Sequence, residues 1–275
     1  MFRLLVRAVR GFAAAMQLLT RIPVPVRVPF DHETMKASAV SFPLAGAAIG
    51  LAAAAAAAAL LQLLPALPAA ALALAVWTAA TGGLHLDGWM DTADGTLSNR
   101  PREQMLEIMK DSRVGAMGVT AGVLLLIAKF AALAALLGSA GTACWAAIAA
   151  IPVWSRWWMT AAIAAWPYAR GEGGMGALFR GVGAIHAACA AAVGLAVTFA
   201  LLCAGGAAPA AWSGLPVPGA AALTALTFPA LAAAFGWPLG RWLNRRLGGQ
   251  TGDTYGAMNE WTEAGLLLVL TALYA

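Results

Sequence analysis

The sequence predicts an all-α protein, a polytopic bundle of six or seven transmembrane helices with the loops of an active site on its cytoplasmic face. Of its 275 residues, 61% are hydrophobic and only 11% are charged, and the mean hydropathy is +0.78. Because a soluble domain carries about 25% charged residues, this composition excludes a soluble globular protein. We expect one integral-membrane domain over 1–275, with 1–41 as an interfacial N-terminal segment and 42–275 as the membrane bundle.

The N-terminal segment begins with an amphipathic helix over 2–20. Arg3, Arg7 and Arg10 recur every three to four residues among apolar side chains, so they share one helical face. This pattern is typical of a helix lying in the membrane interface. No small-residue cleavage site follows, which argues against a cleaved signal peptide. Pro23 and Pro25 then end the helix.

Apolar runs long enough to cross a bilayer, which takes about 20 residues, follow the N-terminal segment. They lie at 42–64, 66–83, 114–137, 141–165, 184–204 and 219–240. A further run at 264–275 is short and crosses only if its helix begins near Asn259. The cysteines lie in apolar stretches without the spacing of a disulfide frame or a zinc site; they are Cys144, Cys189 and Cys203.

The distribution of basic residues predicts the orientation. Six spans place 84–113, 166–183 and 241–263 on the side of the N-terminus, and these loops are rich in Lys and Arg, whereas the opposite loops hold none. By the positive-inside rule, the first set of loops is cytoplasmic. Its basic residues are Arg100, Arg102, Lys110, Arg113, Arg170, Arg180, Arg241, Arg245 and Arg246.

An acidic cluster at 83–95 is the segment around which the chain is organised. The chain has twelve acidic residues, and Asp87, Asp91 and Asp94 fall here at spacings of four and three. On a helix these spacings place the side chains on one face, where carboxylates repel one another unless a cation binds them. Oxygen ligands suit Mg²⁺, with Mn²⁺ as the alternative, whereas zinc prefers His and Cys. We predict a metal site, against the alternative of a solvated acidic face.

The polar residues that follow this cluster extend the site. Residues 101–111 have the pattern of a short amphipathic helix that ends in Lys110, Asp111, Ser112 and Arg113. Asp111 would complete the metal site, and Lys110 and Arg113 would bind phosphate. For the two basic residues, anchoring at the membrane border is the alternative.

Two further polar segments lie on the same predicted side. The first is rich in glycine at 167–176 and supplies Arg170 and Arg180, which would bind an anion beside close-approaching backbone amides; a plain glycine-rich turn is the alternative. The second, 248–260, carries Asp253, Asn259 and Glu260. We expect it to fold over the aspartates and to bind substrate or a second metal, because acidic groups beside apolar spans are costly unless paired; a solvated cytoplasmic loop is the alternative.

Two basic residues lie inside predicted spans, Lys129 and Arg156. Charges at such positions usually face the interior of the bundle and serve a function. Arg156 stands among tryptophans at 154–158, where an anionic ligand or ring faces would satisfy it, so we count it as a substrate-binding candidate. Lys129 can extend toward the membrane border and carries less weight.

Carboxylates for a metal, arginines for phosphates and flexible glycine loops together indicate metal-assisted phosphoryl transfer at the membrane surface. We assign Asp91 and Asp94 to catalysis, with His85 as the candidate general base. A histidine between two leucines is more often structural, so this last role stays open. No GxxxxGK[ST] phosphate loop occurs in the chain, and ATP hydrolysis therefore has no support.

The chain resembles the cobalamin synthase family, the adenosylcobinamide-GDP ribazoletransferases. The matching stretches lie at 19–25, 82–95, 106–115, 155–156, 167–170, 248–257 and 259–260, and those at 82–95 and 106–115 are the most specific. The resemblance implies a Mg²⁺-dependent enzyme of the bacterial inner membrane that joins adenosylcobinamide-GDP to α-ribazole, or to its 5′-phosphate, and releases GMP. The implied partners are these substrates and the lipid bilayer; no nucleic acid is expected, and the oligomeric state is left open.

Two other functions fit the sequence less well. The CDP-alcohol phosphotransferases also use membrane aspartates, but their pattern requires Ala-Arg where this chain has Asp91-Thr92. A cation transporter would carry its carboxylates at mid-membrane depth, whereas Asp87, Asp91 and Asp94 lie at the cytoplasmic end of a predicted span.

Overall fold

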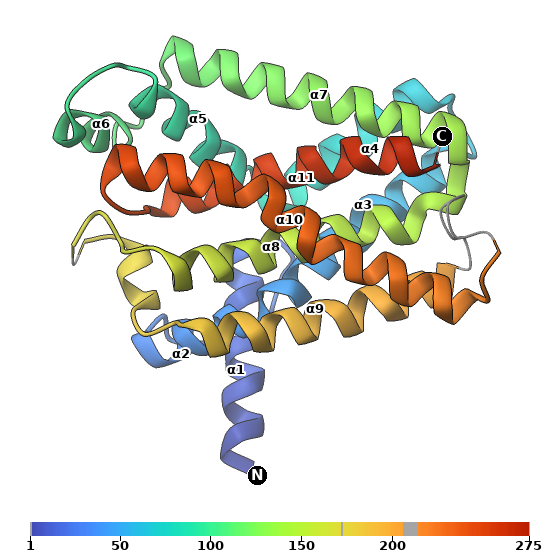
Figure 1. The fold of residues 1–275 in the computed structure, drawn as a ribbon, viewed down its shortest axis with the longest axis horizontal. Helices are drawn as coiled ribbons and strands as arrows, with labels where there is room; N and C mark the ends of the chain where they lie inside the picture. Colours follow the sequence, from blue (N-terminus) through green and yellow to red (C-terminus); the bar gives the residue numbers. More distant parts are fainter. Residues whose placement is uncertain (1, 172, 206–213, 275) are drawn as a thin grey trace.

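The computed structural model describes residues 2–171, 173–205 and 214–274, and in these ranges the fold is helical (Figure 1). An isolated bridge between Tyr168 and Gln250 is the β-pairing found there. The expected all-α class is thus confirmed. The helices are α1 (Phe2–Leu19), α2 (His32–Ser38), α3 (Phe42–Leu60), α4 (Ala66–Thr81), α5 (Leu84–Thr96), α6 (Arg102–Ile108), α7 (Ala116–Ala140), α8 (Trp145–Ala165), α9 (Ala184–Gly205), α10 (Val217–Leu247) and α11 (Gly252–Tyr274), with short 3₁₀ turns η1 (Ala39–Ser41), η2 (Gly141–Cys144) and η3 (Met175–Phe179).

Among the described residues, four helical segments are long and apolar enough to cross a membrane: His32–Leu60, α7, α9 and α10. The number rises to five if α4 and α5, which meet at 87°, form one broken span. Helices α8 and α11 cover the predicted runs at 141–165 and 264–275, but they carry buried charged side chains and are not among the four. The apolar helices support a membrane protein, whereas the predicted count of six or seven spans is not confirmed.

The sharp turn between α4 and α5 sets the acidic helix at 87° to the helix before it. Gly82 and Gly83 adopt φ values of 65° and 75°, in the left-handed region that favours glycine. Helix α5 therefore departs at a steep angle from α4, although the two are contiguous in sequence. The aspartates thus stand on a short helix of their own rather than on the end of the long apolar one.

Helices α3 and α8 pack closely because small residues line their contact. A Cβ atom at Gly46 would lie 2.1 Å from the carbonyl oxygen of Pro152, and one at Gly50 would lie 2.1 Å from that of Ala149. Two glycines four residues apart let two helix backbones approach each other in a membrane bundle. Large buried side chains fill the surrounding core, among them Trp77, Leu133, Ile148 and Trp154.

The polar segments gather at one end of the bundle, on the left in Figure 1. Helices α5 and α6 lie there together with the connections from α8 to α9 and from α10 to α11, whereas the α3–α4 and α7–α8 connections lie at the opposite end. Helix α1 confirms the predicted N-terminal helix and projects from the bundle. Its Arg7 forms a surface ion pair of 2.6 Å with Glu33.

The contact between α3 and α8 predicts a marked steric effect. Gly46→Ala should lower the free energy of unfolding by about 1–3 kcal/mol, because the added methyl group overlaps backbone atoms that cannot easily shift. Gly138→Ala in α7 is the matched control, since its Cβ would meet only Ala66 at 3.9 Å. Thermal unfolding in detergent, followed by tryptophan fluorescence, measures both. Equal melting temperatures for the two variants would contradict the close packing.

Candidate functional site

A cavity of about 210 Å³ lies where the polar segments meet. Four of its lining residues carry chemistry: His85 and Asp87 from α5, Arg170 from the α8–α9 connection and Asp253 from α11. Apolar side chains form much of its remaining wall, including Leu19, Phe42, Met159, Phe179 and Tyr255. The cavity thus combines an acidic side with an apolar side.

Helices α5 and α11 approach each other closely at this cavity. A Cβ atom at Gly88 would lie 2.7 Å from the carbonyl oxygen of Asp253, and one at Gly256 would lie 3.2 Å from Cα of His85. Only glycine permits this separation of the two backbones. Asp87 and Asp253, which are far apart in sequence, therefore line the same cavity.

Negative charge predominates beside the cavity. Arg170 Nη2 donates to Asp253 Oδ2 at 2.7 Å. Asp91, one helical turn after Asp87, is close enough to be repelled by Asp87, Asp253 and Asp94 and attracted by Arg170. Burial raises the pKa of the Asp253 carboxyl, while its ion pair with Arg170 opposes that rise. The carboxylates thus outnumber the arginine that neutralises them, and a cation would relieve their repulsion.

Backbone pairing fixes the position of Arg170. The amide of Ala169 donates to the carbonyl of Gln250 at 2.7 Å, and the amide of Gln250 donates to the carbonyl of Pro167 at 2.7 Å. The Gln250 side chain in turn donates to the carbonyl of Gly240 at 2.8 Å. These hydrogen bonds therefore join the second and third polar segments directly beside the ion pair. Residue 172, inside the predicted glycine-rich loop, lies outside the described residues.

Asp94 has a different environment from the other two aspartates of its helix. Its carboxylate accepts the backbone N–H groups of Gly115 and Gly118, each at 2.7 Å. Amides in the first turn of a helix have no partner within that helix, and a negative charge is favourable there. A Cβ atom at Gly118 would lie 2.3 Å from the Asp94 carboxylate. Asp94 therefore caps α7 and joins it to α5.

Asp111 lies at the surface and is paired with Arg113. Its carboxylate accepts the backbone amide of Arg113 at 3.0 Å and the guanidinium Nη2 at 2.7 Å. These hydrogen bonds lower the pKa of Asp111 to about 2. Asp111 does not line the cavity that Asp87 and Asp253 share, so its place in the metal site stays a prediction.

The remaining predicted phosphate-binding residues lie on the surface near this end. Lys110 forms an ion pair of 2.7 Å with Glu107, and the Arg113 side chain is 88% exposed beside Asp111. Arg180 Nη2 donates to the carbonyl of Gly171 at 2.9 Å, which places it on the loop that carries Arg170. Of the predicted basic ligands on this loop and in the segment after α6, Arg170 is the one that lines the cavity.

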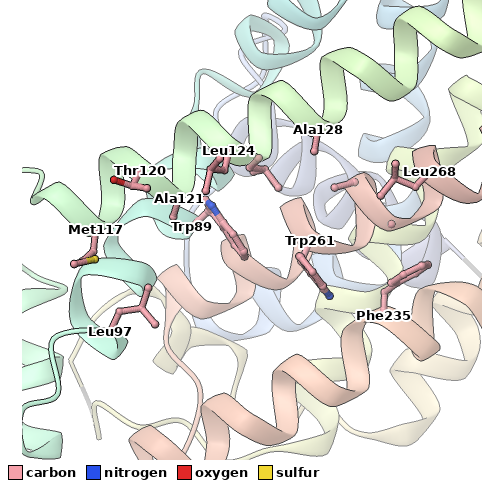
Figure 2. Close-up of a pocket in the computed structure, with 13 residues that line it drawn as sticks. Trp89, Leu97, Met117, Thr120, Ala121, Leu124, Ala128, Phe235, Trp261 and Leu268 are labelled. Atoms are coloured by element: carbon pink, nitrogen blue, oxygen red, sulfur yellow. The ribbon is translucent and has the colours of Figure 1, made fainter.

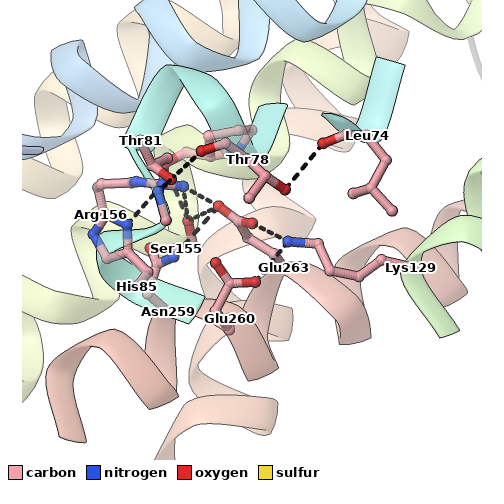
Figure 3. A network of polar contacts seen from close by, with 12 residues as sticks. Leu74, Thr78, Thr81, His85, Lys129, Ser155, Arg156, Asn259, Glu260 and Glu263 are labelled. Atoms are coloured by element: carbon pink, nitrogen blue, oxygen red, sulfur yellow. Dashed lines mark hydrogen bonds and ion pairs between the residues drawn. The ribbon is translucent and has the colours of Figure 1, made fainter. Parts of the chain in front are cut away.

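Three other predicted substrate-binding residues, Arg156, Asn259 and Glu260, lie inside the bundle instead (Figure 3). Lys129 Nζ donates to Glu260 at 2.7 Å and to Glu263 at 2.6 Å. Glu263 also pairs with Arg156 and accepts from Asn259 at 3.4 Å. None of these three lines the cavity, and Arg156 and Glu260 are instead paired with charges inside the bundle. Arg156 Nε and Asn259 Oδ1 find no hydrogen-bond partner among the described residues, and the assignment of the three to substrate binding stays a prediction.

Sequence reasoning missed this network for a physical reason. A buried charge requires a partner of opposite sign, and the partners stand on helices that are far apart in the chain. Lys129 lies in α7, beside the ring of Trp77 at 5.0 Å, whereas Glu263 lies in α11. The useful signal was the position of Lys129 in the middle of an apolar run, together with acidic residues at the start of the last one.

A second, apolar pocket of about 380 Å³ lies between α5, α7, α10 and α11 (Figure 2). Trp89 and Trp261 form a stacked pair along it, with ring centroids 6.1 Å apart. It holds neither acidic nor basic lining residues. This pocket therefore offers packing surface rather than groups for phosphoryl transfer.

The metal-ligating side chains near the cavity determine which kind of metal site it can form. Among the described residues, no three His, Cys, Asp or Glu side chains are arranged to hold a metal ion by themselves. Mg²⁺ is usually bound through one or two carboxylates, with water and substrate phosphates completing its shell. Asp87 and Asp91, on one face of α5 and repelled by each other, fit a site of that kind.

Comparison with known proteins covers nearly the whole chain. The family model described as cobalamin-5-phosphate synthase matches residues 11–271. The adenosylcobinamide-GDP ribazoletransferase of Brevibacillus brevis is 38% identical over 94% of this chain and 97% of its own. The proteins of that name from Roseiflexus sp. and Geotalea daltonii are 38% and 35% identical, over 94% and 96% of this chain and 87% and 98% of their own. No solved structure matches the chain.

The different environments of Asp94 and Asp91 predict that removing each charge affects stability differently. Asp94→Asn turns one acceptor into a donor that faces a backbone N–H. The free energy of unfolding should therefore fall by about 1–3 kcal/mol. Asp91→Asn removes a charge that three carboxylates repel, so its stability should equal or exceed that of the parent. Thermal unfolding without substrate or added metal compares the two. If Asp94→Asn proved as stable as Asp91→Asn, the capping role would be wrong.

Proposed function

The chain belongs to the cobalamin-5-phosphate synthase family, and we propose that it joins adenosylcobinamide-GDP to α-ribazole, or to its 5′-phosphate, and releases GMP. The observation that carries this proposal is the cavity where Asp87, Arg170 and Asp253 converge. Carboxylates and an arginine around an unfilled space suit a pyrophosphate and a metal. The extensive apolar wall suits the large organic groups of both substrates.

The transfer exchanges a phosphoanhydride bond for a phosphoester bond. The ribose 3′-hydroxyl oxygen of α-ribazole forms a bond to the phosphorus attached to the cobinamide arm. The bond between that phosphorus and the bridging oxygen of the pyrophosphate breaks, and GMP leaves with the electron pair. The proton of the hydroxyl group is released. Because little covalent chemistry falls to the protein, its residues act by positioning and by charge.

Asp87 and Asp91 are the residues we propose to hold Mg²⁺, with Asp253 close by. Bound Mg²⁺ would supply positive charge to the pyrophosphate and to the departing phosphate. The Asp87 and Asp91 pair presents oxygen atoms on one helical face, and their mutual repulsion favours a cation between them and the substrate. Asp94 remains a predicted ligand whose carboxylate already accepts two backbone amides.

Arg170 is the residue we propose to bind the pyrophosphate. Its guanidinium donates to Asp253, and its planar fork can bind a phosphate by two parallel hydrogen bonds. The paired backbone of Ala169 and Gln250 keeps it at the edge of the cavity. Arg180, on the same loop, would contact the outer part of the nucleotide.

We also propose that the protein lies in the bacterial inner membrane with the cavity on the cytoplasmic side. The apolar helices support membrane insertion. The loops that carry most of the Lys and Arg residues form the end of the bundle that holds the cavity (Figure 1), in line with the positive-inside rule. Lipid would then surround α7, α9 and α10.

A direct assay measures GMP release by the purified protein in detergent, with adenosylcobinamide-GDP and α-ribazole as substrates. We expect turnover with Mg²⁺, loss of turnover on chelation with EDTA, and recovery on adding the metal back. Asp91→Asn should abolish turnover while the protein remains folded, because the variant removes a metal-binding oxygen and a charge without removing a structural hydrogen bond.

Glu103→Gln is the matched control, because Glu103 is an exposed carboxylate on α6 that does not line the cavity; its GMP release should equal that of the parent. Near-normal Mg²⁺-dependent turnover by Asp91→Asn would remove Asp91 from the site. A parent protein that releases no GMP from this substrate pair would overturn the proposed function itself.

A further inference from the structure

We propose that Arg156 is a positioning residue that holds His85 as a neutral hydrogen-bond donor, with its Nε2–H directed to a phosphate oxygen of the substrate. This inference rests on the proposed function, since the phosphate belongs to that reaction. It assigns Arg156 a role through His85, and it replaces the expectation that His85 serves as a general base.

The contact between the two side chains determines which imidazole nitrogen carries the proton. Arg156 Nη2 lies 3.4 Å from His85 Nδ1. A guanidinium group can only donate hydrogen bonds, so Nδ1 must accept and its lone pair faces Arg156. The proton of the neutral ring is then on Nε2. In a buried histidine, the hydrogen bond made by one ring nitrogen fixes the state of the other.

Arg156 is itself held in place, so this contact is not incidental. Its side chain is fully buried, and its Nη1 donates to Ser155 Oγ at 2.9 Å and to Glu263. Glu263 is anchored in turn by Lys129 at 2.6 Å. Figure 3 shows His85 at one end of this chain of contacts. The orientation of the His85 ring is therefore set by residues of α7, α8 and α11.

The second ring nitrogen has no such partner. His85 is 1% exposed, and its Nε2 finds no hydrogen-bond partner among the described residues. Buried polar groups are nearly always satisfied, and a donor left without a protein partner beside a cavity indicates a ligand. His85 lines the cavity together with Asp87 and Arg170, the residues proposed for the metal and the pyrophosphate.

A phosphate oxygen is the acceptor that this environment favours. Phosphate presents only acceptor oxygens to a donor, and a fixed donor in a poorly hydrated site stabilises charge that develops during transfer. With Nδ1 engaged by Arg156 and Nε2 protonated, the ring offers no free lone pair. His85 therefore cannot accept the proton of the attacking hydroxyl group.

Two amide substitutions at His85 distinguish a role as hydrogen-bond donor from a role as general base. In His85→Gln, the side-chain amide nitrogen reaches the position of Nε2, whereas in His85→Asn it reaches only that of Nδ1; neither amide can act as a base. If His85 is a donor, kcat for GMP release should stay within about tenfold of the parent in His85→Gln. It should fall by about 10²–10³-fold in His85→Asn and His85→Ala, as for loss of one fixed donor at a transition state.

His32→Gln, at an exposed histidine on α2, is the control and should match the parent. Equal losses in all three His85 variants would overturn the donor role in favour of a base. Unchanged kcat in all three would show that His85 only packs.

A spectroscopic measurement tests the role of Arg156 without any turnover. Histidine labelled with ¹⁵N gives signals from three residues, His32, His85 and His186, and the spectrum of His85→Gln identifies those of His85. We expect the Nε2–H tautomer in the parent protein. We expect loss of that preference in Arg156→Met, and its retention in Arg156→Lys, which keeps a cationic donor.

An Nδ1–H tautomer or an imidazolium ion in the parent would overturn the inference. If the parent shows the Nε2–H tautomer but releases no GMP, the proposed function fails and the positioning of His85 by Arg156 stands. The two failures are thereby distinguished.

Discussion

The need to neutralise charge inside an apolar bundle is the constraint on which the rest of this structure depends. Lys129 and Arg156 meet Glu260 and Glu263 in the interior, two positive side chains against two negative ones. Removal of one partner from a buried pair leaves an uncompensated charge, at a cost of about 3–5 kcal/mol. This requirement holds α7, α8 and α11 in one arrangement, and the contact of Arg156 with His85 extends it to α5.

The same helices have a balanced interior and an acidic end. Helix α11 contributes Glu263 to the internal network and Asp253 to the cavity. Helix α5 contributes Asp87 to the cavity, and its His85 lines the cavity and also contacts Arg156 of the network. Because the interior is already paired, the carboxylates at the end are the ones left with excess negative charge. Rigid elements fixed by an internal network are what a site for phosphoryl transfer requires, since positioning supplies much of the catalysis.

Local patterns predicted the fold class, most helix positions and the acidic cluster, since hydropathy and spacing are properties of neighbouring residues. They could not show which partner a side chain meets from elsewhere in the chain. Asp94 shares the helical spacing of Asp87 and Asp91, yet the amides of α7 take its carboxylate. Arg156 was expected to bind an anionic ligand or aromatic rings, yet the anion it meets is Glu263. Neither pairing can be recognised from the local sequence, because both depend on how the helices pack.

The central claim is that α5 and α11 bring Asp87 and Asp253 to one cavity. Chemical crosslinking between these two positions tests that claim most directly. The test requires Asp87→Cys and Asp253→Cys in a chain from which Cys144, Cys189 and Cys203 have been removed, treated with a short thiol crosslinker in native membranes. A second pair, Asp87→Cys with Leu63→Cys, places one thiol on the exposed connection between α3 and α4. Crosslinking of the first pair and not of the second is the predicted result. Failure of the first pair to crosslink, with or without substrate, would contradict the shared cavity.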